Sequence, residues 1–418
     1  MTTPENDNLS GRLDAQLPPD IVSLLRDAGA AAEAGGQRLY LVGGVVRDLL
    51  LGKGTRDLDL VVEGDALEVA GRLASTPGVR LVARSQFGTA KLCRANWVID
   101  IATARSEVYP RPGALPSVSP GDIRSDLFRR DFTINAMAVS LSPGDHGRLL
   151  DFYGGRRDLA AGLVRVLHER SFADDATRIW RVVRYEQRLG FTIEPATLAL
   201  LHRDIAMLDA ISGARIRHEL ELALEEPRPE RVLARAGELG ALFRINPALE
   251  GDGRLAGRYE RARELSRPAA PSPWLYLALL GYDLAADDIG ALTDYLHLPK
   301  AAAAALRETV GLKSRLEELA DPGIRQSAVY SLLCGYGHIA VTANLIASDN
   351  PVVRGHLETY LNRLRFVRTH LDGEFIKGLG VTGPRIREVL RQVHAARLDG
   401  EVATRREEEE LARRLAGF

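Results

Sequence analysis

Residues 41–52 read LVGGVVRDLLLG, and residues 57–60 read DLDL shortly after them. An apolar, β-rich run ends in two glycines, Gly43 and Gly44, and helix-forming residues follow. Glycines at such a turn let backbone N–H groups approach a phosphate closely, and the start of the helix adds partial positive charge. Arg47, one turn into that helix, could reach the same anion. A Gly-Gly turn is usually only a tight connection, so this stretch alone does not establish a phosphate site.

Two carboxylates in the second run make the phosphate interpretation specific. Residues i and i+2 of a strand point to one face, so we expect Asp57 and Asp59 to project together while Leu58 and Leu60 face a core. Two neighbouring anions repel unless a cation lies between them, and carboxylates completed by substrate phosphates suit Mg²⁺. The alternative is that one aspartate caps a turn and the other is solvated. We predict a magnesium site at Asp57 and Asp59.

A third carboxylate, Asp100, lies in the apolar run VIDI at residues 98–101. A buried acid flanked by β-branched residues needs a partner. A metal ion in the same pocket would serve, and a salt bridge to Arg105 would serve as well. Asp100 is therefore a third candidate catalytic residue, with both alternatives open.

The string RRDFTINA at residues 129–136 offers phosphate and ribose contacts. Paired arginines can bind phosphate in a bidentate manner. Asp131 and Asn135 could bond ribose hydroxyls or hold Arg130 in place. The alternative is a surface ion-pair cluster at a helix start. We predict that Arg130 and Asp131 bind the nucleotide.

Residues 171–184 read SFADDATRIWRVVR. Ser171 and Asp174 have the spacing of a capping box, which predicts a helix start here and assigns Asp174 to capping. The charged residues that follow at steps of three share one helix face: Asp175, Arg178, Arg181 and, slightly further round, Arg184. A solvated stripe of ion pairs is the usual explanation of such a pattern.

Asp175 beside Arg178 also suggests how a base is chosen. Cytosine and adenine both present an exocyclic amino donor next to a ring-nitrogen acceptor, whereas uracil and guanine present the reverse. A carboxylate beside a guanidinium matches the first pattern and leaves the second facing unpaired groups. Each unpaired buried polar group costs about 1–3 kcal/mol. We predict selection of CTP and ATP, with Arg181 and Arg184 adding positive charge for the triphosphate.

The hydrophobic pattern divides the chain into two regions with different periodicity. Up to about Leu150, short β-rich runs alternate with helical stretches, and a proline-rich loop over 109–120 is expected to be extended and mobile. From Arg157 onward the β signal disappears and helical spacing takes over. We therefore expect an α+β protein with a small mixed-sheet head and a long all-helical arm. The expected strands are Leu39–Val42, Leu58–Val62, Trp97–Ile101 and Ala136–Leu141, and the expected helices include Val46–Leu51, Leu67–Ala74, Ala173–Leu189, Ile216–Leu224, Pro229–Leu239, Ala301–Leu319 and Pro384–Ala396.

Composition limits the partners and the compartment. The 418 residues carry a formal net charge of −1, so contacts with a nucleic acid must come from local patches. Cys93 and Cys334 lack metal-like spacing and are expected to be reduced core thiols. The first residues are polar and acidic, unlike a secretory signal, and apolar runs such as Trp274–Leu280 are too short to span a bilayer. We expect a soluble cytoplasmic protein without membrane contact.

Together these strings resemble class II tRNA nucleotidyltransferases, the CCA-adding enzymes of the poly(A) polymerase superfamily. The resemblance runs from about Tyr40 to Leu224, with five motifs in the family's order. It implies that Asp57 and Asp59 bind catalytic metals and that Gly44 and Arg47 touch the nucleotide. The other implied motifs are Arg129–Asp131 for nucleotide and ribose, Asp151–Asp158 for a hinge, Asp175, Arg178, Arg181 and Arg184 for the template that selects CTP and ATP, and Ile211–Leu220 for a bracing helix.

Two residues depart from the family pattern, which usually has Glu at Asp174 and at Ala214. The first change keeps the charge but shortens the side chain, and the second puts one bracing contact in doubt. Residues 380–384 and 396–400 resemble the helical tail of some bacterial members, which would hold the tRNA elbow by shape and backbone. The implied organisation is a disordered tail at 1–20, a polymerase-β-like nucleotidyltransferase head at 21–152, a helical neck with the template at 153–228, a helical body at 229–330 and a tRNA-binding helical tail at 331–418.

The expected function is therefore addition of C, C and A to a tRNA 3′ end from CTP and ATP, with Mg²⁺ as cofactor. The RNA partner would be held at its acceptor arm and elbow, and no protein partner is implied. A poly(A) polymerase or a partial CC-adding or A-adding enzyme is the alternative within the superfamily. A non-catalytic RNA-binding protein is the alternative from another class, and it would predict a broken Asp-x-Asp motif.

Overall fold

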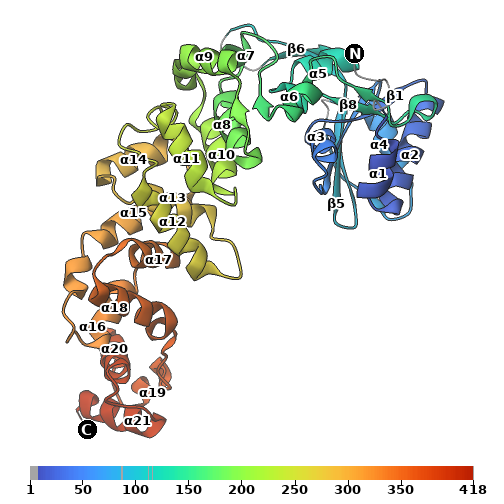
Figure 1. The fold of residues 1–418 in the computed structure, drawn as a ribbon. Coiled ribbons are helices and arrows are strands. Elements are labelled where there is room, and N and C mark those ends of the chain that lie inside the picture. The colour runs from blue at the N-terminus through green and yellow to red at the C-terminus, as the bar shows by residue number, and fades with distance from the viewer. Residues whose placement is uncertain (1–7, 86–87, 112, 115, 418) are drawn as a thin grey trace. The chain divides into compact units, whose positions relative to one another are not determined.

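The computed structural model describes residues 8–85, 88–111, 113–114 and 116–417. The chain forms two compact units, residues 1–219 and residues 220–418. In Figure 1 the first unit runs from blue to green and contains the large sheet, and the second runs on to red and is helical. This confirms the predicted α+β head followed by helices.

The head contains a mixed seven-stranded sheet with the strand order β3-β4-β5-β2-β1-β8-β9. β2 and β5 run parallel, and the other neighbouring pairs are antiparallel. The four expected strands all lie in this sheet, but the β3–β4 hairpin was missed because its residues alternate only weakly between apolar and polar. The strands are β1 (Arg38–Val42), β2 (Asp57–Glu63), β3 (Val79–Ser85), β4 (Thr89–Arg94), β5 (Trp97–Thr103), β8 (Ala138–Ser140) and β9 (Leu149–Leu150).

The two faces of this sheet have different coverings. α2 (Pro19–Ala34) and α4 (Ala66–Ala74) pack against each other and against the strands, and Figure 1 shows them along one side of the sheet. On the opposite face Tyr40 and Val61 pack with Leu127 of α5 (Ile123–Phe128). Since side chains alternate along a strand, Asp57 and Asp59 lie on this second face together with Val61.

The N-terminal segment corrects one expectation. Residues 1–20 were expected to be disordered, and residues 1–7 lie outside the described part of the chain, but α1 spans Ser10–Gln16. Leu9 and Leu13 are buried. The Arg12 guanidinium donates to the carbonyls of Leu49 and Leu50 at 3.2 and 2.9 Å, at the end of α3 (Gly44–Leu51). The buried leucines recur every fourth residue, at Leu9, Leu13 and Leu17. Together with the Arg12 contact they order a segment whose composition is mostly polar.

Part of the expected proline-rich loop is also regular structure. β6 (Arg105–Val108) pairs antiparallel with β7 (Ser117–Pro120). The last four residues of the expected loop are therefore a strand. A second small sheet joins β10 (Leu163–Val164) to β11 (Thr192–Ile193) beyond the point where the β signal was expected to end. Strands this short leave too few residues to show a period of two.

The expected helix over 173–189 is interrupted. α7 (Ser171–Asp174) ends at Asp175, whose extended backbone (φ −142°, ψ 97°) precedes α8 (Thr177–Leu189). Helical spacing continues across the break, which is why the sequence predicts one helix. The remaining helices of the first unit are α6 (Gly155–Ala160), α9 (Pro195–Asp204) and α10 (Gly213–Leu224), the last of which crosses into the second unit.

Helices build the described part of the second unit around separate apolar clusters. One cluster includes Leu333, Val341 and Leu357, and another includes Ile376 and Val393. Proline opens several of these helices, where its missing N–H costs no hydrogen bond. The helices are α11 (Pro229–Glu238), α12 (Gly253–Ser266), α13 (Pro273–Leu280), α14 (Ala286–Tyr295), α15 (Lys300–Lys313), α16 (Gln326–Leu333), α17 (His338–Ala347), α18 (Pro351–Asn362), α19 (Gly373–Gly378), α20 (Pro384–Leu398) and α21 (Arg405–Ala416).

Two further expectations can be compared with the structure. Cys93 and Cys334 are free, but Cys93 is only partly buried and Cys334 is exposed, so neither is a fully buried core thiol. Within the described ranges no single helix is long and apolar enough to cross a membrane. α16 and α17 reach that length and composition only as a pair bent by 115°.

Candidate active site

A cleft of about 1260 Å³ lies in the first unit. Its walls come from the strands that carry the aspartates, from the start of α3, from the β6 strand and from α8 and α10. It gathers residues that lie far apart in the sequence. The predicted site residues that line it are Gly43, Gly44, Arg47, Asp57, Asp59, Asp100, Arg130, Asp131, Asp175, Arg178 and Arg181.

The three predicted carboxylates lie on the cleft face of β2 and β5. The parallel register places Asp59 opposite Asp100, and Asp57 lies two residues before Asp59. Burial raises the pKa of Asp59 above its usual value. The Arg130 charge opposes this rise, and the charges of Asp100 and Asp57 add to it. The expected pair on one strand face is thus present, with a third carboxylate across from it.

Asp100 differs from its expected environment. Its side chain is 44% exposed, and its carboxylate forms an ion pair with Lys91 of the neighbouring strand at 3.1 Å. Arg105 pairs with Glu107 instead. The expectation of a buried acid was wrong because this face of β5 opens into the cleft, which the apolar flanking residues do not reveal.

Gly43 forms the turn between β1 and α3 in a conformation that requires glycine. Its backbone has φ +77° and ψ −137°. A Cβ there would lie 2.7 Å from Nη1 of Arg130 and 3.6 Å from Oδ2 of Asp59. The bare turn lets the Arg130 guanidinium lie directly against it, beside Asp59. The first turn of α3 follows, and the first turn of a helix leaves N–H groups without intrahelical partners.

Arg47 is buried rather than free to meet an anion. It is 3% exposed, and its Nε and Nη2 donate to Asp48 at 2.9 and 3.1 Å. Its Nη1 donates to Oδ1 of Asn135 at 2.7 Å. In this arrangement Arg47 ties α3 to the segment after Arg130. A direct contact with the nucleotide remains a prediction.

Arg130 is held by a residue that the sequence reasoning missed. Its Nη2 lies 3.1 Å from Oδ2 of Asp126, a fully buried carboxylate on α5 that also pairs with Arg129 at 2.6 Å. Asp131 and Asn135, the expected holders of Arg130, bond to each other at 3.0 Å. The spacing of Asp126, three and four residues before the two arginines on a helix, was the available signal.

Asp131 pairs with Arg181 across the cleft wall. The Nε and Nη2 of Arg181 donate to Oδ2 of Asp131 at 2.9 and 2.6 Å. Burial alone would raise the pKa of Asp131, but the Arg181 charge and the Asn135 hydrogen bond lower it below its usual value. Two predicted nucleotide-binding residues from separate motifs therefore form one partly buried ion pair.

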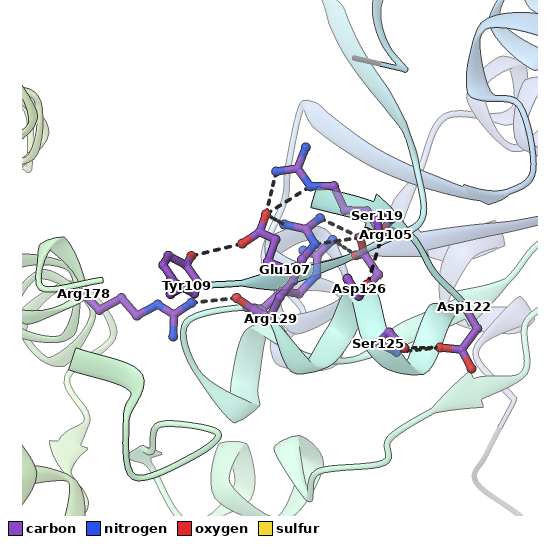
Figure 2. A network of polar contacts seen from close by, with 11 residues as sticks. Arg105, Glu107, Tyr109, Ser119, Asp122, Ser125, Asp126, Arg129 and Arg178 are labelled. Atoms are coloured by element: carbon purple, nitrogen blue, oxygen red, sulfur yellow. Dashed lines mark hydrogen bonds and ion pairs between the residues drawn. The ribbon is translucent and has the colours of Figure 1, made fainter. Parts of the chain in front are cut away.

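Glu107 and Tyr109 are further cleft residues that the sequence reasoning missed. Figure 2 shows Glu107 between Arg105, Arg129 and the Tyr109 hydroxyl, which donates to its carboxylate at 3.1 Å. Burial, with the Glu107 charge, raises the pKa of Tyr109 to about 12. The Arg129 carbonyl accepts from Nη2 of Arg178 at 2.7 Å, also visible in Figure 2. This network connects the β6 strand to the predicted template helix.

The predicted capping box at Ser171 is not formed. Ser171 is inside α7 and its hydroxyl accepts from Nη1 of Arg178 at 2.7 Å, while Asp174 pairs with Arg170 at 3.2 Å. A helix does begin at Ser171, as predicted, and a second helix begins after the break at Asp175. Oδ1 of Asp175 accepts from the Thr177 N–H at 3.0 Å, so Asp175 supports the start of α8.

Asp175 and Arg178 nevertheless both face the cleft with capacity for further hydrogen bonds. Oδ1 of Asp175 also accepts from Arg215 of α10 at 2.8 Å, whereas Oδ2 accepts no hydrogen bond from the described residues. Arg178 is 4% exposed and fixed by the Arg129 and Ser171 contacts. The acceptor and the donor predicted for base selection are thus held rigidly.

Arg184 is the one predicted residue outside the cleft lining. It lies 3.7 Å from Oε2 of Glu219, and Arg181 lies 3.7 Å from Oε1 of the same carboxylate. Burial raises the pKa of Glu219, and the charges of Arg181 and Arg184 oppose this. Glu219 and Arg215 are therefore the residues by which α10 braces α8. Ala214 lines the cleft without a charged group of its own.

In the part of the chain that the structure describes, no three His, Cys, Asp or Glu side chains are arranged to hold a metal ion by themselves. A metal ion at Asp57 and Asp59 would need further oxygen ligands from substrate. That requirement is typical of Mg²⁺, which keeps waters and phosphate oxygens in its shell.

Comparisons with known proteins agree with one another. The profile of the poly(A) polymerase head domain matches residues 39–165, and the profile described as a probable RNA and SrmB-binding site of polymerase A matches residues 190–252. An A-adding tRNA nucleotidyltransferase of Geobacter sulfurreducens is 35% identical over 97% of this chain, which spans about half (48%) of that relative. A CC-adding tRNA nucleotidyltransferase of Deinococcus radiodurans is 36% identical over 73% of this chain and 78% of its own length.

Solved structures extend the similarity over nearly all of the chain. A CCA-adding enzyme in an apo form has a TM-score of 0.82 and 32% identity, with 96% of this chain and 97% of that one covered. A Thermotoga maritima CCA-adding enzyme complexed with tRNA has a TM-score of 0.75 and 33% identity, with 97% and 98% covered. The chain also spans about half of further relatives, 45% of an A-adding enzyme from Aquifex aeolicus and 54% of one from Halalkalibacterium halodurans.

Proposed function

Because the chain belongs to the tRNA nucleotidyltransferases, which carry the poly(A) polymerase head domain, we propose that it adds C, C and A to the 3′ end of tRNA from CTP and ATP. One observation carries this proposal. Asp57 and Asp59 lie on the same strand face beside the Gly43 turn, and the Arg130 guanidinium lies against that turn. Two carboxylates next to a basic, glycine-lined pocket suit a metal-bound triphosphate.

The donor set fits Mg²⁺. Asp57, Asp59 and, across the strand pair, Asp100 supply only oxygen atoms, and the pKa of Asp59 is raised by burial and by the other two carboxylates. A cation would relieve that repulsion. Bound at Asp57 and Asp59, magnesium would stabilise negative charge on the attacking and leaving oxygens. Asp100 is proposed as a further support, since it already shares its charge with Lys91.

The proposed reaction is an in-line displacement at the α-phosphorus. The RNA 3′-hydroxyl oxygen forms the new bond to phosphorus as the bond to pyrophosphate breaks, and the hydroxyl proton is lost. Arg130 lies closest to the glycine turn and would bind the triphosphate, with Arg181 adding positive charge from its pair with Asp131. These groups position the nucleotide before reaction rather than move during it.

Base selection is proposed to rest on Asp175 and Arg178. The free Oδ2 of Asp175 would accept from the exocyclic amino group of cytosine or adenine, and Arg178 would donate to the ring nitrogen. Arg215 and the Thr177 N–H hold Asp175, and Arg129 and Ser171 hold Arg178. A rigid pair discriminates because it cannot rotate to suit a carbonyl beside an N–H.

A-adding activity alone is the second candidate. It is supported by the A-adding relatives, one of which matches 97% of this chain at 35% identity. The RNA partner is the same, and we propose contacts with the acceptor arm by the first unit and with the elbow by the helical tail. Transcripts that differ only at their 3′ ends separate the two candidates.

The decisive experiment uses tRNA transcripts ending before the first C, after C and after CC. Each is incubated with Mg²⁺ and one of the four nucleoside triphosphates. We expect CTP to extend the first two transcripts and ATP to extend only the third. Extension of the third transcript alone would establish an A-adding enzyme, and long adenylate tails on any RNA would indicate a poly(A) polymerase.

A matched pair of variants tests the carboxylates. Asp57→Asn is expected to reduce addition by at least about a thousandfold while the Kd for tRNA changes little, because it removes a charge that binds the metal. Asp65→Asn, outside the cleft and able to keep its capping role on α4, is the control. Residual addition near the wild-type rate by Asp57→Asn would refute the assignment, and binding of RNA without any addition by the unaltered chain would indicate the non-catalytic alternative.

A further inference from the structure

Tyr185 on α8 is surrounded by arginines at the cleft. The guanidinium carbons of Arg47, Arg184 and Arg181 lie 5.2, 5.3 and 5.9 Å from the centre of its ring. Phe132, which is fully buried, meets the same ring edge-on at 5.7 Å and 79°. The ring also lines the cleft.

These arginines come from two elements of the candidate site. Arg47 lies on α3, directly behind the glycine turn, and Arg181 and Arg184 lie on α8 with Arg178. Each also pairs with a carboxylate: Arg47 with Asp48, Arg181 with Asp131 and Glu219, and Arg184 with Glu219. The Tyr185 ring meets all three cations.

Three guanidinium groups gathered at one ring repel one another. An aromatic face carries negative charge density and attracts cations, by about 0.5–1 kcal/mol at exposed sites and about 2 kcal/mol or more when water is excluded. Arg47 and Arg184 are 3% and 6% exposed, so most of their surroundings are dry. A saturated side chain at this position would lack this attraction and leave the carboxylates alone to offset the repulsion.

We propose that Tyr185 is a positioning residue for the nucleotide site, and this rests on the proposed function. Its ring fixes α3 to α8 through cation–π contacts. In doing so it holds the phosphate-binding turn at a set spacing from the Asp175 and Arg178 pair that reads the base. The consequence is specific: weakening the ring's negative face loosens binding of CTP and ATP without loss of the fold.

The test lowers the electron density on the face of the Tyr185 ring without changing the size of the ring. Full-length protein is prepared with Tyr185→Phe and with 3,4,5-trifluorophenylalanine at position 185, because fluorine withdraws charge from the face and leaves the shape nearly unchanged. Dissociation constants for CTP and ATP are measured with Mg²⁺ in the absence of RNA. We expect Tyr185→Phe to bind within about twofold of wild type and the trifluoro variant to bind about fivefold more weakly.

Turnover and RNA binding complete the measurement. The trifluoro variant should show a raised KM for the nucleotide, a kcat for single addition within about threefold of Tyr185→Phe, and an unchanged Kd for tRNA. If the trifluoro variant binds nucleotide as well as Tyr185→Phe, the ring is only apolar packing and the proposal is wrong. Tyr185→Leu is expected to bind about tenfold more weakly, and the fluorinated pair decides the question if that variant fails to fold.

Tyr282 supplies a matched control in the second unit. Arg258 and Lys313 lie 4.7 and 4.5 Å from its ring centre, and it does not line the cleft. The same fluorinated replacement there should leave nucleotide affinity unchanged, and an equal loss would overturn the proposal by showing a general effect. If the unaltered chain binds neither CTP nor ATP, the proposed function fails. If it binds both and all position-185 variants match it, only the Tyr185 proposal fails.

Discussion

At the scale of single residues, Gly43 is the position where backbone conformation and site chemistry coincide. Its φ of +77° disfavours any side chain, and a Cβ would lie 2.7 Å from the Arg130 guanidinium. We expect Gly43→Ala to lower the free energy of unfolding by about 2–3 kcal/mol, because strain and displacement of Arg130 add. It should also raise the KM for nucleotides, measured in the addition assay.

Gly52 provides the control that separates backbone strain from displacement of Arg130. It has φ +68° at the end of α3, but a Cβ there would meet open space. Gly52→Ala should therefore cost only the backbone strain, about 1 kcal/mol in urea unfolding, with a normal KM. Equal destabilisation and equal KM values for the two variants would show that the close approach of Arg130 to Gly43 has no consequence.

The pair of Asp131 and Arg181 gives a pH dependence with a defined sign. Burial opposes ionisation of Asp131, but Arg181 and Asn135 lower its folded-state pKa below the unfolded value of about 4. The pair thus contributes stability above that unfolded pKa and loses it as the pH falls through the lower folded pKa.

Urea unfolding of wild type and Asp131→Asn measures this contribution. At pH 7 the variant should be less stable by about 2 kcal/mol, because a charged hydrogen bond to Arg181 is lost. The difference should stay constant down to about pH 4 and shrink below it. A difference that grows as the pH falls would contradict the direction of the shift.

The residues that the sequence predicted best are those whose geometry is local. Asp57 and Asp59 share a face because a strand repeats every two residues, and that period is visible in the sequence alone. The exposure of Asp100 depends on what covers β5, and the Lys91 contact depends on the register of β4. Neither the exposure of Asp100 nor its contact with Lys91 can be predicted from the residues next to it in the sequence.

At the scale of secondary structure, β6 and the residues directly after α5 form one side of the cleft. Asp126 of α5 accepts from Arg129 and Arg130 and is fully buried, and Arg129 reaches Glu107 on β6 at 3.3 Å. Figure 2 shows Asp126, Arg129 and Glu107 together with the Asp122 cap of the same helix. The helix therefore carries the carboxylate that holds the two arginines directly after its end.

Asp126→Asn tests this element. Removing the charge takes the Asp126 carboxylate away from both arginines, and among the described residues only Arg129 keeps another ion-pair partner, Glu107, so we expect a loss of about 3 kcal/mol in unfolding free energy and a raised KM for nucleotides. Asp122→Ala on the same helix removes only the cap to Ser125, at 2.8 Å, and should cost about 1 kcal/mol with a normal KM. A normal KM for Asp126→Asn would show that Arg130 is positioned without it.

Element boundaries were predicted less well than element types. The break at Asp175 leaves the apolar spacing of α7 and α8 in phase, so the sequence predicts one helix. A helix does begin at Ser171, as expected, but the capping box is not formed because the Ser171 hydroxyl accepts from Arg178. Tertiary contacts with Arg215 and Arg129 decide that geometry, and they come from distant parts of the chain.

At the scale of the whole molecule, the mixed-sheet head and the helical remainder follow from a change of hydrophobic period that the sequence displays. The separation into units at residues 219 and 220 does not, because α10 continues through it as one helix from Gly213 to Leu224. The cleft draws all of its lining from residues up to Glu219. The nucleotide site proposed for this cleft can therefore be tested on a fragment that lacks most of the second unit.

A fragment of residues 1–224 keeps the entire cleft and the whole of α10, including Arg215 and Glu219. We expect it to unfold cooperatively and to bind CTP and ATP within about threefold of the full chain, because every lining side chain is retained. Its KM for tRNA should rise at least about tenfold, because the helical tail proposed to hold the elbow is missing.

A fragment ending at residue 212 lacks the bracing contacts from α10 and should lose nucleotide affinity as well. If the folded longer fragment cannot bind nucleotide, the second unit contributes to the site and the cleft alone is insufficient. If it extends tRNA with an unchanged KM, the elbow contact proposed for the tail is wrong.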